Sequence, residues 1–348
     1  MNKSFSFDSN PSLLDFVKVW NNYNDPLPLS SSHTYFLDEL PASIPQLSAF
    51  EFHLDPNNSL CDTLLCIPIA RLQSLKSCLS KAVSIDSATL SFISKTISQI
   101  QELNHRTSLL CLIDHIWLEL DSPPANTFSL FLGPENYIQP KEERDLFFDQ
   151  CLDFFLSTEE ELTLFELQKS YLRYYFDLLI DIIPEWQLSE IGIMRQSSEG
   201  QHLKMLFSPP TSLSLAELLE LLLKSTFPGS QILGLVDQNV ILSQLTKFPH
   251  TCKLSFSNYR TQCQMAIEVK PEFQPNMLET FEEFWKLFFE LIQPLGFSGS
   301  HLRQPTHIRI NSGMWLLESR LHHFKIFESR DGSLSFKFYR DWRISRNL

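Results

Sequence analysis

Residues 49–70, with the sequence AFEFHLDPNNSLCDTLLCIPIA, carry the pattern that decides the fold. Apolar and polar residues alternate in the first half, so Phe50 and Phe52 lie on one face of a predicted strand and Glu51 lies on the other. The turn-forming residues DPNN follow at 55–58, and a second apolar run comes after them. The stretch therefore predicts an antiparallel hairpin of two strands, 49–55 and 63–70.

The same hairpin pattern occurs five times along the chain, and helical patterns lie between the hairpins. The last predicted turn contains Asp331-Gly332, which is a strong hairpin signal. Two segments stay open, because 231–245 also fits a strand and 307–310 has an extended pattern. The predicted hairpins pair 49–55 with 63–70, 112–121 with 128–133, 190–196 with 202–208, 253–257 with 264–270, and 322–328 with 333–342. The predicted helices span 72–81, 88–103, 142–156, 159–183, 213–225, 233–246, 277–294 and, more weakly, 314–320.

Repeated hairpins separated by helices are compatible with two architectures. One is an open sheet with helices on one face, and the other is a sheet closed inside a ring of helices. Closure removes exposed strand edges. Ile116, Leu118 and Leu120 also offer an apolar face to the helices, while the opposite face of that strand is polar and aromatic. We expect an α+β fold, a closed antiparallel ten-stranded β-barrel surrounded by α-helices. The expected domains are an N-terminal arm, 1–47, with a helix at 11–21 and an aperiodic connector at 25–45, and a single barrel domain, 48–348.

Composition excludes several classes of protein. The 348 residues carry a formal net charge of -13, which argues against a nucleic-acid-binding surface. The N-terminal residues lack the apolar run of a signal peptide, and Glu217 and Glu220 interrupt the most apolar later stretch. The seven cysteines are odd in number and include no C-x-x-C pair, so neither a disulfide framework nor a zinc site is indicated. We expect a cytoplasmic protein with no membrane span.

Five successive units of helices and antiparallel strand pairs resemble the ABBA-type prenyltransferases, which have the PT-barrel fold. The resemblance extends from about residue 11 to residue 342 and rests on the order of the elements. The segment Phe336-Lys337-Phe338-Tyr339 is similar to the Lys-x-Tyr strand pattern that binds diphosphate in the indole branch of this family. The resemblance implies transfer of an isoprenoid group from a prenyl diphosphate to an electron-rich acceptor inside the barrel. The acceptor would be a small aromatic molecule, an indole or a peptide side chain.

Such a reaction needs cations around the leaving diphosphate and an aromatic wall that shields the carbocation. Basic residues lie on the polar faces of the predicted strands, and they form a candidate diphosphate clamp. The alternative for each one is an ordinary solvated side chain, because unpaired charges avoid protein interiors. A cationic interior without a bound anion would be costly. The candidate diphosphate-binding residues are Lys204, Lys253, Lys270, Arg309, Lys325, Lys337 and Tyr339.

One strand face in the second hairpin carries His115, Trp117 and Glu119. Glu119 is the candidate catalytic residue, an acid or base that orients the acceptor, since members of the family place a carboxylate on an early strand. Trp117 and His115 are candidates for shielding the substrate, because an aromatic face stabilises a cation. The alternative is that Glu119 pairs with a basic residue and that Trp117 only packs.

The sequence favours a reaction that requires no metal. It contains no Asp-Asp-x-x-Asp box, and no Gly-rich phosphate loop is present. His322 and His323 are expected to alternate across a strand, which would prevent both from binding one metal ion. Mg²⁺ stays as the one candidate cofactor.

Two other kinds of protein stay open. One is a non-catalytic barrel that binds a small ligand or a protein partner, and the other is an interaction protein with an open sheet. The enzyme interpretation requires the candidate cations to converge inside a closed barrel.

Overall fold

The hairpins predicted from the alternating pattern are present, and their strands join into one sheet. The computed structural model describes residues 7, 10–24, 26–53, 61–79, 87–103, 112–121, 128–134, 141–156, 162–196, 200–208, 213–225, 233–234, 243–244, 247–259, 262–272, 278–293, 306–310, 315–328 and 334–346. The strands are β1 (Leu47–His53), β2 (Cys61–Pro68), β3 (Ile113–Leu120), β4 (Phe128–Pro134), β5 (Gln187–Gln196), β6 (Gly200–Ser208), β7 (His250–Tyr259), β8 (Gln262–Pro271), β9 (Thr306–Ile310), β10 (Trp315–Glu328) and β11 (Leu334–Arg346). The helices are α1 (Leu13–Tyr23), α2 (Ser31–Glu39), the 3-10 turn η1 (Ile69–Arg71), α3 (Leu72–Leu79), α4 (Ser87–Leu103), α5 (Lys141–Leu156), α6 (Leu162–Ile182), α7 (Leu215–Lys224) and α10 (Leu278–Ile292).

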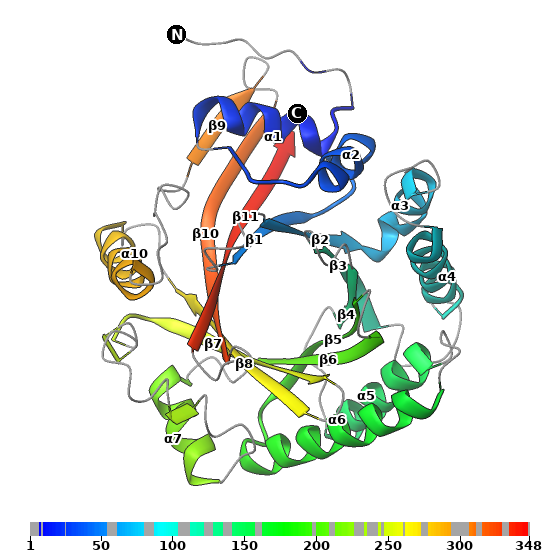
Figure 1. Ribbon diagram of the computed structural model, residues 1–348, viewed down its shortest axis with the longest axis vertical. Coiled ribbons are helices and arrows are strands. Elements are labelled where there is room, and N and C mark those ends of the chain that lie inside the picture. The colour runs from blue at the N-terminus through cyan, green and yellow to red at the C-terminus, as the bar shows by residue number, and fades with distance from the viewer. Residues whose placement is uncertain are drawn as a thin grey trace.

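Ten of the strands form a closed antiparallel barrel. β1 to β8 follow one another in chain order, then come β10 and β11, and β11 pairs back with β1. Figure 1 looks into this ring, with the helices around its outside. The closed ten-stranded barrel surrounded by helices is therefore confirmed. In the described part of the chain, no helix is both long enough and apolar enough to cross a membrane.

The fifth hairpin is longer than predicted. Residues 314–320 were expected to be weakly helical, but Trp315 to Ser319 belong to β10 and pair with β9. The helical prediction was wrong because buried and less buried residues alternate with period two along this segment. The extended pattern at 307–310 was correct, and it corresponds to β9. β9 pairs with β10 and lies beside the closed ring.

The core lies between the barrel and the helices. Ile116, Leu118 and Leu120 of β3 are buried in it, as expected. Elsewhere around the barrel, Phe207 of β6 enters the same core and packs on Phe176 of α6, at 5.8 Å between ring centroids. Because every second strand residue enters this core, the residues between them face the barrel interior, which we call the inner face.

The N-terminal helices pack on the same core. Trp20 of α1 contacts Trp342 of β11 at 5.3 Å between ring centroids, and the Arg340 guanidinium lies 5.1 Å above the Trp20 ring. α2 lies in the connector, 25–45, where no helix was predicted. A local cap explains it, because the Ser30 side chain accepts a hydrogen bond from the backbone N–H of His33. The predicted helix 233–246 falls mostly outside the described residues.

Gly192 of β5 makes a close approach that a larger residue would disturb. A Cβ atom there would lie 2.3 Å from the Phe131 ring and 2.4 Å from the Leu130 carbonyl oxygen. We expect Gly192→Ala to lower the free energy of unfolding by about 1–3 kcal/mol, measured by urea denaturation, because the added atom would overlap a neighbouring backbone as well as a ring. Gly234→Ala is the control, since no described heavy atom lies within 4 Å of the added Cβ. Equal losses in the two variants would contradict the steric explanation.

Candidate functional site

Seven charged side chains from seven strands meet on the inner face, and we call them the central charge cluster. Their burial is unusual for ionisable residues, since six of the seven have residue exposures of 9 % or less and only the Lys337 side chain reaches 21 %. Four are carboxylates and three are lysines, so the opposite charges nearly balance. The members are Glu51 of β1, Asp62 of β2, Glu119 of β3, Lys204 of β6, Glu268 of β8, Lys325 of β10 and Lys337 of β11.

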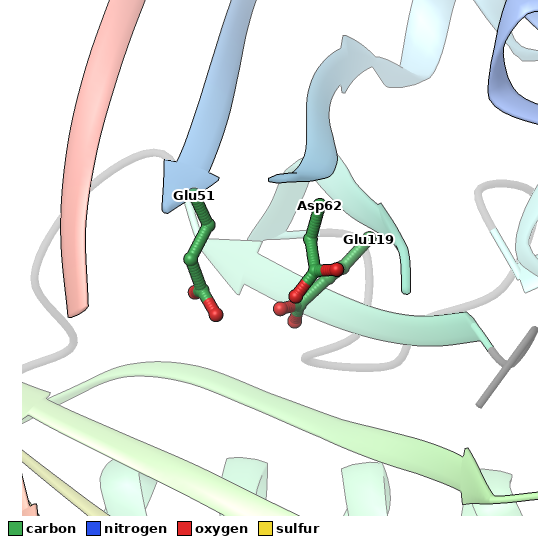
Figure 2. A group of neighbouring side chains, drawn as sticks. All are labelled: Glu51, Asp62 and Glu119. Atoms are coloured by element: carbon green, nitrogen blue, oxygen red, sulfur yellow. The ribbon is translucent and has the colours of Figure 1, made fainter. Parts of the chain in front are cut away.

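The carboxylates Glu51, Asp62 and Glu119 come from three neighbouring strands and point toward one another (Figure 2). One oxygen from each lies within 4.8 Å of the others. Of these residues only Glu119 was predicted. Glu51 had a usable signal, since it alternates with Phe50 and Phe52, whereas Asp62 precedes the predicted strand 63–70.

Two of the three lysines of the cluster pair with carboxylates of the chain itself. Lys337 forms an ion pair and a hydrogen bond with Glu51, and Tyr339 also hydrogen-bonds Glu51. The Lys325 ammonium lies 3.7 Å from Glu268. A bound anion is therefore not needed to balance these lysines.

The cluster shifts the pKa values of its members in opposite directions. Burial and the charges of Glu51 and Asp121 raise the pKa of Glu119 to about 8, although Lys204 and Lys337 act against this shift. Burial and the neighbouring Lys204 charge lower the pKa of Lys325 to about 7. Glu119 consequently holds a proton at neutral pH, and it can donate a hydrogen bond that an ordinary glutamate cannot.

A second group of cations lies on the inner face nearer the exposed rim of the barrel, and we call it the rim group. It consists of Lys253 of β7, Lys270 of β8, Arg320 of β10 and Arg343 of β11, which lie around Asp341 and His322. The Lys253 side chain is 37 % exposed and lies 3.6 Å from Glu190. The two arginines were not predicted, because Arg320 fell in the segment expected to be helical and Arg343 follows the predicted end of the last strand.

The expected alternation of His322 and His323 is wrong. The pairing of β10 with β11 shifts register between Leu321 and His323, which is a β-bulge. A bulge inserts one residue into a strand, so two consecutive side chains reach the same face. The two Nδ1 atoms lie 2.8 Å apart, and the His323 ring stacks on Tyr339 at 3.9 Å between centroids.

Three predicted site residues remain, and the structure places Trp117 and His115 on the inner face but Arg309 outside it. Trp117 and His115 share the inner face of β3 with Glu119, and their rings contact edge to face at 6.4 Å. The Phe131 ring lies on the neighbouring strand, 5.0 Å from the Lys204 ammonium. Arg309 is exposed on β9, which lies beside the ring, so it does not join either group of cations.

The carboxylates Glu51, Asp62 and Glu119 are oxygen ligands of the kind that Mg²⁺ prefers. However, the Lys337 ammonium already contacts Glu51, and it supplies positive charge at this place. Without any metal, the residues near the rim can bind an anion, and Glu119 can exchange protons and form hydrogen bonds.

No family model and no curated protein sequence matches the chain, but solved structures resemble it. PriB, a prenyltransferase in its apo form, superposes with a TM-score of 0.50 at 10 % identity, over 89 % of this chain and 90 % of that one. 5-Dimethylallyltryptophan synthase from Streptomyces coelicolor gives a TM-score of 0.49 at 10 % identity, over 95 % and 97 %. AnaPT from Neosartorya fischeri gives 0.48 at 10 % identity, over 85 % and 77 %. With its closed ring of ten strands and outer helices, the chain has the prenyltransferase-barrel fold.

Proposed function

We propose that the protein transfers an isoprenoid group from a prenyl diphosphate to an electron-rich acceptor, a small aromatic or indole compound or a peptide side chain. The observation that carries this proposal is the meeting of lysines, Tyr339 and the buried Glu119 on the inner face of a barrel of this fold. Allylic transfer breaks the bond between the isoprenoid carbon and the diphosphate oxygen, and the diphosphate leaves with the electron pair. Positive charge must therefore lie near the leaving group.

The proposed roles follow the two groups of cations. The rim residues Lys253 and Lys270 contact the diphosphate first, because they lie nearer the exposed end of the barrel. Tyr339 and the three lysines of the central charge cluster complete the set of diphosphate-binding residues. These lysines are Lys204, Lys325 and Lys337. Arg309 is left out, since it lies on β9.

The inner face of β3 and β4 would receive the allyl cation and the acceptor. Trp117, His115 and Phe131 place aromatic rings there, and such rings stabilise cations by about 0.5–2 kcal/mol each. Glu119 lies beside Trp117 on the same strand face. It would orient the acceptor by a hydrogen bond and, when ionised, take the proton that the acceptor releases as its new bond to the isoprenoid carbon forms. Because side chains supply the positive charge, we propose that Mg²⁺ is not required.

The second candidate is a non-catalytic barrel that binds a ligand or a protein partner. The balanced charges of the central charge cluster favour it, because Lys337 and Lys325 are already paired with Glu51 and Glu268. The two candidates differ in whether a bound prenyl donor is converted to product.

Thermal unfolding with dimethylallyl and geranyl diphosphate tests donor binding. We expect a donor to raise the melting temperature by several degrees, since a ligand at about 100 times its Kd stabilises by about 2.7 kcal/mol. Lys270→Met should reduce the rise, while Lys224→Met, on the exposed helix α7, should leave it unchanged. Mass spectrometry with tryptophan, simple phenols and Trp- or Tyr-containing peptides then tests transfer. Protection without product would favour the non-catalytic barrel, and no protection by either donor would contradict the proposed function.

A further inference from the structure

The bulge in β10 builds a histidine pair that no step of the proposed transfer uses. His322 and His323 approach to 2.8 Å between their Nδ1 atoms. One of these nitrogens must donate the hydrogen and the other must accept it, so the pair holds one proton between the two Nδ1 atoms. The histidine that donates this hydrogen has a free Nε2, which can take a further proton and give the pair a positive charge.

Charged and polar groups from five strands surround the pair. Cations come from three of these strands: Lys253 on β7, Lys270 on β8, and Arg320 and Lys325 on β10. Two carboxylates also lie within ion-pair range, since Asp341 Oδ2 is 3.5 Å from His322 Nδ1 and Glu268 Oε2 is 3.9 Å from His323 Nε2. Tyr339 on β11 covers the His323 ring, and Glu51 on β1 also faces it.

Burial and the neighbouring cations together hold the pair in its neutral form in the absence of a ligand. Burial lowers the pKa of His322, and His323, Lys270 and Arg320 lower it further. Burial first and then Lys253 lower the pKa of His323, although Glu51 acts against them. The surroundings also disfavour a metal cation at this place, although two imidazoles lie side by side. They favour an anion.

We propose that the rim group and the His322 and His323 pair form a proton-coupled site for a phosphate-class anion, in which the anion binds among Lys253, Lys270, Arg320 and Arg343 and the pair takes up one proton. The site is open to solvent, since the side chains of Lys253 and His322 are 37 % and 19 % exposed. An anion there neutralises the cations that repel the second proton, so the proton and the anion bind with positive cooperativity.

This proposal rests on the proposed function only for the identity of the anion, the diphosphate of a prenyl donor. When the carbon to oxygen bond breaks, its electron pair stays on the diphosphate and adds a negative charge to it. The histidine pair then gives its extra proton to a diphosphate oxygen and returns to its neutral form. The leaving group is thereby neutralised in part at the moment when its charge develops.

Isothermal titration calorimetry in two buffers of different ionisation enthalpy counts the protons that accompany binding. Sulfate and pyrophosphate are the probes, because sulfate keeps a constant charge near neutral pH and so reports protons of the protein alone. We expect uptake of up to about one proton per sulfate near pH 7, where histidine ordinarily begins to titrate. Pyrophosphate should bind more tightly than sulfate.

Variants separate the anion from the proton. His322→Gln and His323→Gln should each abolish most of the proton uptake and still bind sulfate, whereas Arg320→Met and Arg343→Met should weaken binding about tenfold. His202→Gln is the control for the histidines, since His202 is buried on β6 away from the pair. Arg346→Met is the control for the arginines, because Arg346 lies on the Trp315 side of β11.

Equal proton uptake in the wild type and in both histidine variants would overturn the proposal, as would failure of both anions to bind. Product formation plays no part in this measurement. If the protein binds anions with proton uptake but forms no product, the proposed function is wrong and the proton-coupled site is supported. If the protein forms product without proton uptake, the proposed function is supported and the proton-coupled site is wrong.

Discussion

Replacing Lys337 by methionine is expected to lower the free energy of unfolding by about 3–5 kcal/mol. Lys337 is the cation that pairs with Glu51, and the Glu51 side chain is only 2 % exposed. Burial alone would lower the pKa of Lys337, but the charges of Glu51, Asp62 and Glu119 outweigh it and raise the pKa. Without the ammonium group, the Glu51 carboxylate stays buried among two other acids. Urea denaturation at neutral pH measures the loss.

The double variant Glu51→Gln with Lys337→Met is the matched control for this loss. Removing both charges leaves no unpaired buried ion, so the double variant should recover more than half of the stability that the single variant loses. A loss below about 1 kcal/mol in the single variant, or no recovery in the double one, would show that the pair does not carry the stability of the central charge cluster.

Glu119→Gln is expected to reduce product formation by a factor of about 10²–10⁴, the range found when a group that exchanges protons with a substrate is removed. Glutamine keeps the size of the side chain and its capacity for hydrogen bonds, but it cannot release or accept a proton. Protection against thermal unfolding by the prenyl donor should stay within about a degree of the wild type, because Glu119 is assigned to the acceptor. Steady-state product formation and melting temperature are measured on the same samples. Unchanged product formation would remove Glu119 from the mechanism.

The same variant should gain stability relative to the wild type as pH rises. Burial raises the pKa of Glu119 in the folded protein to about 8, from an ordinary value of 4.5. Between these two values the unfolded chain releases the proton while the folded protein keeps it, so wild-type stability falls as pH rises. The glutamine side chain of the variant has no proton to lose. The stability difference between variant and wild type should therefore be larger at pH 8 than at pH 5 by a few kcal/mol, measured by urea denaturation. A difference of the same size at both pH values would contradict the raised pKa.

Much of the fold was determined by local sequence patterns. The alternation around Phe50 and Phe52 specifies a strand with one apolar face, because successive side chains of a strand point to opposite sides. The same rule is sufficient to assign Trp117, Glu119 and Lys337 to inner faces. Five repeats of the hairpin, with apolar helices between them, then favour closure over an open sheet with unpaired edges.

Local patterns could not show which residues meet at the site, because this depends on which strands become neighbours when the ring closes. Lys337 and Glu51 are 286 residues apart in sequence, and they meet because β11 pairs with β1. Arg309 has the same alternating pattern as the other basic residues, yet β9 lies beside the ring. The bulge before His323 also had no local signal, since it arises from a register shift between two long strands.

By itself the sequence determined the strands and the faces of their side chains, which follow from local periodicity. Only the tertiary structure decided which charges balance one another and which of them line the rim where an anion can reach them, because that balance depends on distances across the closed barrel.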